Sequence, residues 1–182
     1  MHWSFLLLDL LPLLVFVVLE SMMANLRYAL VGAACSIVLL LGFDLFLFGE
    51  IDEFTILSSG LVIVFGVLAV RFDNAAYFKI KPAVVNLILA GVFLTTHLQG
   101  SPLVLTALDR YGETFPPQVQ QILSRPEVRP MLERMSLYLG FGLVAQAAAV
   151  TWAALKLGSW WWFAIRSAGF YTMIFLVALA AK

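Results

Sequence analysis

Six apolar stretches follow one another along this chain, and each is close to the length that a helix needs to cross a lipid bilayer. A transmembrane helix takes roughly 20 residues to span about 30 Å of hydrocarbon. The stretches predict an all-α fold: a polytopic integral membrane helix bundle with five to six transmembrane helices and a short interfacial helical connection. We expect a single membrane domain over residues 1–182, with spans at 3–22, 26–48, 54–70, 83–98, 135–157 and 160–181.

The first stretch is the least regular of the six. Asp9, Pro12 and Glu20 interrupt its apolar run. Polar groups are costly in hydrocarbon, so this segment either spans with its polar residues near the two surfaces or does not span at all. The sequence leaves both alternatives open.

Two connections differ sharply in length. Residues 71–82 form a short polar link between the third and fourth stretches, and Pro82 is predicted to open the fourth helix, since the first helical position needs no amide proton. The long connection, residues 100–133, is rich in proline, and we expect two short amphipathic helices, beginning near Pro102 and Pro117. These helices either lie in the membrane interface or belong to a solvated loop that faces a partner.

Composition supports a lipid environment. The chain is 63% hydrophobic and 12% charged, whereas soluble domains are about half apolar and a quarter charged. Its eleven basic and eleven acidic residues balance, without a basic tract that could follow phosphates, so nucleic-acid binding is not expected. Lysine and arginine are also shared equally between the two sides of a six-span topology, so the charge count leaves the orientation undetermined.

Catalytic and metal-binding patterns are missing from the sequence. His2 and His97 lie far apart, without acids or cysteines at the spacing of metal ligands. Asp9 and Glu20 lie about three helical turns apart, too far for a carboxylate dyad. We therefore predict no enzyme activity, no catalytic or metal-binding residues and no cofactor.

The ionisable residues in or beside the predicted spans are the candidate contacts with lipid or with a protein partner. Asp9 is either an interfacial carboxylate in water or the partner of a basic group on another helix. Arg166 extends back to the lipid phosphates, stacks on the Trp162 indole, or pairs with Asp9 or Asp44. The remaining candidates lie in the short polar link: Arg71, Lys79 and Lys81, the two lysines being expected to face a phosphate surface.

Small residues recur at helical spacing and predict packing seams, because close backbone approach holds helices together in lipid. The seams are expected at Gly32 and Ser36, at Ala145, Ala149 and Ala153, and at Ala164 and Ala168. Cys35, the single cysteine, is expected to be a small packing residue.

Three motifs resemble one known family. The run Phe65-Gly66-Val-Leu-Ala-Val-Arg-Phe-Asp-Asn74-Ala-Ala-Tyr-Phe-Lys79-Ile-Lys81-Pro82 resembles the hairpin signature of the intracellular septation protein A family of Gram-negative inner membranes. Leu10-Leu-Pro12-Leu is similar to its Phe-Leu-Pro-Leu motif, and Trp162-x-x-x-Arg166-x-x-Gly169 is similar to its Trp-x-x-x-Lys-x-x-Gly. Pro12, Gly66, Asn74, Pro82 and Gly169 are thereby marked as structural motif residues.

The chain also departs from the family pattern. Ile80 stands where the family has tryptophan, and Ala75 and Ala76 replace an acidic pair. The fifth span offers Gln146 and Thr151 in place of the family's asparagine and tyrosine. These differences describe a distant or specialised member.

The resemblance implies a bacterial inner-membrane, multi-pass protein with a role in cell-envelope biogenesis, membrane homeostasis and septation. Its expected partners are membrane lipids and proteins of cell elongation and division; its oligomeric state stays open. The family topology would place both ends and the long connection in the cytoplasm. A rival hypothesis is a small transporter or lipid-translocating protein in which Asp9, Asp44 and Arg166 converge on a polar path.

Overall fold

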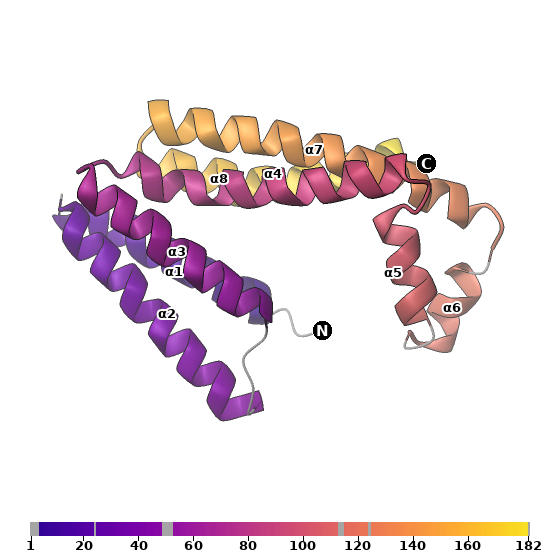
Figure 1. The fold of residues 1–182 in the computed structure, drawn as a ribbon, viewed down its shortest axis with the longest axis horizontal. Helices are drawn as coiled ribbons and strands as arrows, with labels where there is room; N and C mark the ends of the chain where they lie inside the picture. Colours follow the sequence, from indigo (N-terminus) through magenta and orange to yellow (C-terminus); the bar gives the residue numbers. More distant parts are fainter. Residues whose placement is uncertain (1–3, 24, 49–52, 113–114, 124, 182) are drawn as a thin grey trace. The chain divides into compact units, whose positions relative to one another are not determined.

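A computed structural model describes residues 4–23, 25–48, 53–112, 115–123 and 125–181; within these ranges the side chains of residues 4–10, 44, 47–48 and 53–58 are outside the description. No strand occurs among the described residues. The helices are α1 (Ser4–Met23), α2 (Leu26–Phe48), α3 (Glu53–Arg71), α4 (Ala76–Leu98), α5 (Leu103–Tyr111), α6 (Pro117–Leu123), α7 (Val128–Lys156) and α8 (Ser159–Ala180) (Figure 1).

The predicted helical membrane bundle is confirmed. Each of the six predicted spans is occupied by a helix, namely α1, α2, α3, α4, α7 and α8. Within the described residues, four helices are long and apolar enough to cross a membrane, namely α2, α4, α7 and α8. Shorter apolar segments, Leu11–Met23 and Ser59–Arg71, belong to α1 and α3. The crossing of the bilayer by all six helices as a single domain stays a prediction.

The chain divides into two compact units. The first comprises Met1–Lys81 and Thr151–Ala164, and the second comprises Pro82–Val150 and Ile165–Lys182. The first unit therefore holds α1, α2, α3 and the beginnings of α4 and α8, together with the end of α7. The second holds α5, α6 and the longer parts of α4, α7 and α8.

In the first unit α1 packs along α2, and α2 also contacts α3. Gly32 allows the α1–α2 approach, because a Cβ atom at this position would overlap Leu19. Ser36, one turn further along α2, is buried, so the seam predicted at these two positions is confirmed. Gly66 of α3 faces Leu30 of α2 at ordinary contact distance.

In the second unit glycines, and not the predicted alanines, allow the close helix contacts. A Cβ at Gly140 would lie 2.7 Å from Leu94 of α4, and one at Gly142 would lie 2.7 Å from Met173 of α8. Of the alanines predicted as seams on α7 and α8, Ala153 is buried, so that position is confirmed, whereas four are exposed and do not pack within this chain: Ala145, Ala149, Ala164 and Ala168. Glycine permits a closer approach than alanine, so α7 turns its glycine face toward its neighbours.

Two further predictions need correction. The fourth helix begins at Ala76 and not at Pro82. The helix that contains the predicted span 135–157, α7, begins earlier, at Val128, and the span itself stays a prediction. Cys35 is exposed and so is not a packing residue. The two helices expected in the long connection are present as α5 and α6, and Pro102 occupies the N-cap position of α5.

Candidate functional site

The link between α3 and α4 is the local structure on which the candidate site depends. Its hydrogen bonds follow the Schellman pattern: the Asn74 amide donates to the Ala69 carbonyl at 3.0 Å, and the Asp73 amide donates to the Val70 carbonyl at 3.3 Å. In this pattern the residue before Asn74 must adopt a left-handed conformation, and Asp73 does so with φ 48°. Aspartate is one of the few residues other than glycine that adopt this conformation routinely.

Asn74 then starts the next helix. Its side-chain Oδ1 accepts a hydrogen bond from the Ala76 amide at 2.9 Å, which satisfies one of the amides left open at a helix start. α4 can therefore begin six residues before Pro82, which lies inside the helix. Proline cannot donate to the Phe78 carbonyl, so this turn lacks one helical hydrogen bond. Lys79 and Lys81 consequently belong to a helix and not to a flexible link.

Lys79 forms a buried ion pair. Its Nζ lies 3.2 Å from Oε1 of Glu20, near the end of α1, and the two side chains are only 8% and 20% exposed. A charge removed from water is tolerated when it is paired and hydrogen-bonded. Glu20 is thus the group that makes the burial of Lys79 possible.

Two residues of α8 complete this arrangement. The Ser159 hydroxyl donates to Oε2 of Glu20, so both carboxylate oxygens have partners. The indole Nε1 of Trp162, which is fully buried, donates to the backbone carbonyl of Lys79 at 3.0 Å. We refer to Glu20, Lys79, Ser159 and Trp162 as the Glu20 cluster.

An aromatic contact lies beside the ion pair. The rings of Phe16 and Phe78 have centroids 4.3 Å apart, and both side chains are fully buried. Because Phe78 precedes Lys79, this contact helps to hold the start of α4 against α1. The Glu20 cluster and this ring pair together join the end of α1 and the starts of α4 and α8.

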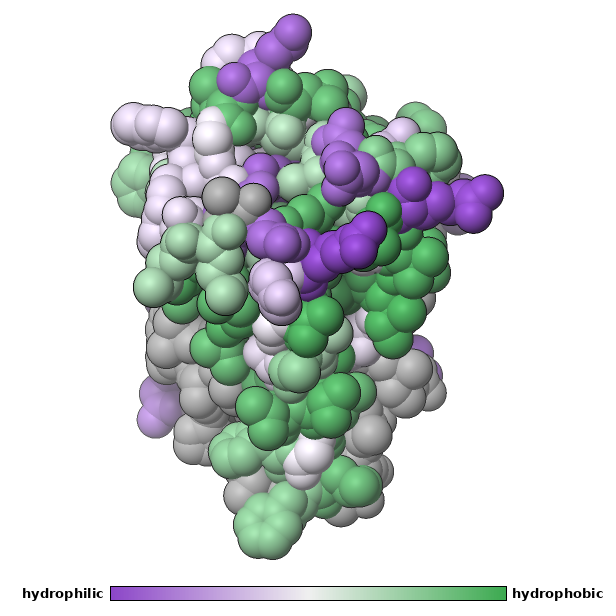
Figure 2. Space-filling model, turned by 90° about the vertical axis from the view of Figure 1, so that its left-hand side faces the viewer, coloured by the Kyte–Doolittle hydropathy of each residue, from purple (hydrophilic) through white to green (hydrophobic). Residues whose placement is uncertain are grey.

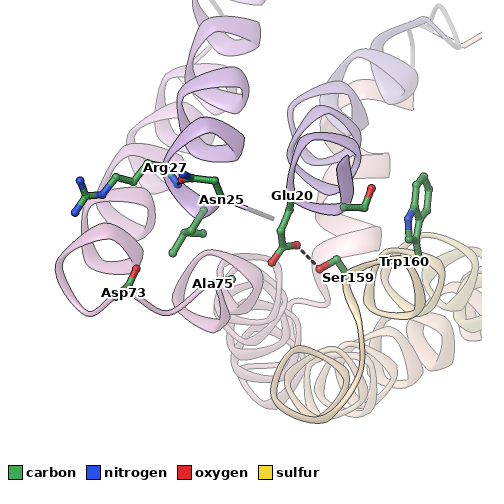
Figure 3. A pocket seen from close by; sticks show the side chains of 9 residues that line it. Glu20, Asn25, Arg27, Asp73, Ala75, Ser159 and Trp160 are labelled. Carbon is green, nitrogen blue, oxygen red and sulfur yellow. Dashed lines mark hydrogen bonds between the residues drawn. The ribbon is translucent and has the colours of Figure 1, made fainter. Parts of the chain in front are cut away.

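An open pocket of about 820 Å³ adjoins the cluster. Figure 3 shows Arg27 and Asp73 on one side of it and Glu20, Ser159 and Trp160 on the other. Its walls come from four places in the sequence: the end of α1, the start of α2, the α3–α4 link and the start of α8. The full lining is Glu20, Ser21, Asn25, Leu26, Arg27, Asp73, Ala75, Ser159 and Trp160.

In Figure 2 hydrophilic side chains gather in the upper part of the face, above a largely hydrophobic surface.

The structure separates the predicted lipid or partner contacts by their exposure. Arg71 is exposed, whereas Lys79 and Lys81 are buried, and Arg166 is half-buried. The lysines expected at a phosphate surface thus turn out to lie inside the protein, Lys79 against Glu20. Contact of any of these residues with lipid or a partner stays a prediction.

Asp9 and Asp44 lie in α1 and α2, but their side chains are outside the described residues. The pairing of Arg166 with either of them, and the polar path of the transport hypothesis, therefore stay predictions. Among the described residues, no group of three or more histidine, cysteine, aspartate or glutamate side chains gathers as metal ligands.

The structural motif residues fall at helix contacts and helix ends. Pro12 is buried within α1, and Gly66, Asn74 and Pro82 have the positions given above. Gly169 of α8 faces Gln146 of α7, whose amide a Cβ at residue 169 would meet at 3.1 Å. The same amide donates to the carbonyl of Ile165 at 3.0 Å, so this polar residue links two helices of the second unit.

Sequence reasoning missed Ser159 and the role of Glu20. From the sequence, Glu20 is predicted only to interrupt the first stretch and to lie too far from Asp9 for a carboxylate dyad. In the predicted six-span topology, Glu20 and the lysine-bearing link lie on the same side of the bilayer, and this is the signal that could have suggested a pair. A serine at a helix start carries no comparable signal, because it is common there as a cap.

Comparison with known proteins identifies the family. The intracellular septation protein A family matches residues 5–181, nearly the whole chain. The inner membrane-spanning protein YciB of Acidithiobacillus ferrooxidans, found in two strains, is 31% identical over 67 residues, which cover 37% of this chain and 36% of the relative. The aligned region is thus little more than a third of the relative's length, and no solved structure matches the chain. This chain belongs to the intracellular septation protein A family and is a multi-pass protein of the bacterial inner membrane.

Proposed function

We propose that this protein serves cell-envelope biogenesis, membrane homeostasis and septation through contacts with lipids and with proteins of cell elongation and division. The family description names septation and no reaction, which favours a role in assembly over one in catalysis. The observation that carries the proposal is the Glu20 cluster. It joins the ends of three helices that are distant in the sequence, and the open pocket beside it gives this end of the first unit a polar surface.

This surface suits contact with headgroups or proteins for a physical reason. Buried polar networks impose order on the segments that they connect, provided that each member has partners. Arg71 is the last residue of α3 and Arg27 lies in the first turn of α2, and both side chains are exposed. An exposed arginine on an ordered support can bind a phosphate or a carboxylate with little loss of conformational entropy.

The test is complementation of a strain that lacks the protein. Loss of the protein is expected to alter cell shape, septum placement and detergent sensitivity, and the unchanged chain is expected to restore them. Arg71→Glu should fold normally, because Arg71 is exposed, but should restore these properties poorly. Arg125→Glu, which reverses an exposed arginine of the long connection, is the matched control and should complement fully.

Affinity purification in mild detergent provides a second measurement. We expect the unchanged chain to retain elongation or division proteins and Arg71→Glu to retain fewer of them. A deletion strain with normal shape and detergent tolerance, together with a purified chain that retains none of these proteins, would contradict the proposed function.

A further inference from the structure

The pocket beside the Glu20 cluster has features of a ligand site that the assembly role does not by itself require. Its volume of about 820 Å³ lies within the range typical of pockets for small molecules. It is open on one side, and its lining contains one arginine and two carboxylates. A ligand with both a negative and a positive group would therefore match it better than one with a single charge.

We propose that this pocket binds the headgroup of a zwitterionic phospholipid that carries a phosphate and a primary ammonium group. The inference deepens the lipid contact in the proposed function and rests on it for the presence of lipid at this surface. Arg27 contacts the phosphate, and Asp73 accepts hydrogen bonds from the ammonium group.

The level of the pocket in the membrane supports a lipid headgroup. Trp160 lines the pocket and is 53% exposed, and its neighbour Trp161 is 68% exposed. Exposed tryptophans at the end of a membrane helix are typical of the interface between hydrocarbon and water. The pocket is therefore at the depth where phosphates and ammonium groups of phospholipids lie.

Arg27 is the cation suited to the phosphate. It is exposed and lies in the first turn of α2, where the backbone amides already favour negative charge. A guanidinium can donate two parallel hydrogen bonds to a phosphate, which a lysine cannot do. Glu20 does not neutralise the phosphate contact, because its two carboxylate oxygens already accept from Lys79 and Ser159.

Asp73 is the acceptor suited to the ammonium group. It is exposed at the rim of the pocket, where its left-handed backbone belongs to the turn between α3 and α4. A primary ammonium group can donate to this carboxylate, whereas a quaternary ammonium group has no N–H to donate. The carboxylate of Asp73 also disfavours a headgroup whose charge is only negative.

The surroundings provide a path for the acyl chains. Met22, Met23 and Tyr28, at the adjoining ends of α1 and α2, are 77%, 53% and 58% exposed. Their sequence neighbours Ser21 and Arg27 line the pocket, so these exposed side chains offer an apolar surface next to its lining residues in the chain. That combination fits a lipid better than a soluble metabolite.

The test is native mass spectrometry of the full chain, purified in detergent, stripped of lipid and mixed with equal amounts of three dioleoyl lipids. These are phosphatidylethanolamine, phosphatidylcholine and phosphatidylglycerol. We expect phosphatidylethanolamine to be retained most and phosphatidylglycerol least. Arg27→Gln should weaken phosphatidylethanolamine and phosphatidylcholine alike by about tenfold, the effect of one lost charge-assisted contact.

Asp73→Asn separates the two contacts. Asparagine adopts the left-handed conformation as readily as aspartate, so the turn should be kept. The variant should lower the retention of phosphatidylethanolamine to that of phosphatidylcholine and leave phosphatidylcholine unchanged. Arg125→Gln, which neutralises an exposed arginine of the long connection outside the pocket lining, is the control and should bind all three lipids as the unchanged chain does.

Three outcomes would overturn the inference: equal retention of the three lipids, an Arg27→Gln variant that binds normally, or an unchanged lipid preference in Asp73→Asn. Competition by soluble compounds distinguishes a site for the whole headgroup from a site for phosphate alone. Phosphoethanolamine should displace the lipid. Equal displacement by inorganic phosphate would also overturn the inference. The measurement needs no dividing cell, so a failure here leaves the complementation result intact, and a failure of complementation leaves the binding result intact.

Discussion

Two ion pairs of this protein have nearly the same length but very different surroundings. Lys79 and Glu20, in the first unit, are 3.2 Å apart with side chains 8% and 20% exposed. Arg129 and Asp109, in the second unit, are 3.3 Å apart with side chains 66% and 59% exposed. The first joins α1 to α4, whereas the second joins α7 to a short helix of the long connection.

The difference teaches that burial, and not distance, decides what an ion pair does. An exposed pair adds about 0–1 kcal/mol to stability, since water and salt already solvate both charges. In a buried pair, each charge depends on the other, because water cannot replace the missing partner. We therefore expect the Glu20 cluster to determine the structure of its unit and the exposed pair to contribute little.

The largest effect is expected from breaking the buried pair. Lys79→Met should lower the free energy of unfolding by about 3 kcal/mol, the lower end of the range for a broken buried pair, because Glu20 keeps some contact with water. Titration with sodium dodecyl sulfate in mixed micelles measures this change. The double variant Glu20→Lys with Lys79→Glu, which exchanges the two charges, should recover part of the loss. A Lys79→Met variant as stable as the unchanged chain would show that the pair does not contribute to stability.

A smaller effect is expected from removing the hydrogen bond that the Trp162 indole donates. Trp162→Phe keeps most of the buried ring but removes the donor to the Lys79 carbonyl. We expect a loss of about 1–2 kcal/mol in the same titration, since a buried hydrogen bond is removed without a replacement from water. Trp161→Phe is the matched control on the neighbouring exposed indole. Equal losses in the two variants would count against a specific role for the Trp162 bond.

The smallest effect is expected from the exposed pair. Arg129→Gln should lower the free energy of unfolding by less than about 1 kcal/mol, and the difference should vanish as salt is raised. Unfolding measured in low and high sodium chloride tests both statements. A large loss that does not depend on salt would abolish the contrast between the two pairs.

Much of the fold could be predicted from the sequence, because a helix that crosses the membrane needs an apolar segment about as long as the hydrocarbon layer is thick. All six predicted spans are helices, and Pro102 and Pro117 correctly marked the short helices of the connection. Helix starts were predicted less well. Pro82 is predicted as a first residue, but the Asp73 turn and the Asn74 cap start α4 earlier. Such caps depend on backbone geometry that single residues reveal poorly.

The candidate site could be predicted only in part. Lys79 and Arg71 were selected because charge is rare in such a chain, and the structure shows that one is buried and the other exposed. The pairing of Lys79 with Glu20 joins residues 59 positions apart, and Ser159 is 139 positions from Glu20. Local patterns do not encode such separations.

By itself the sequence determined the solvent of this protein, its helical class and its family, because hydrophobicity and motif spacing are properties of the chain read in order. Only the tertiary structure decided which charges face outward and which are paired inside. The glycine contacts of α7 and the assembly of the Glu20 cluster were decided in the same way. The physical reason is that exposure and ion pairing depend on neighbours, which packed helices bring together from distant parts of the chain.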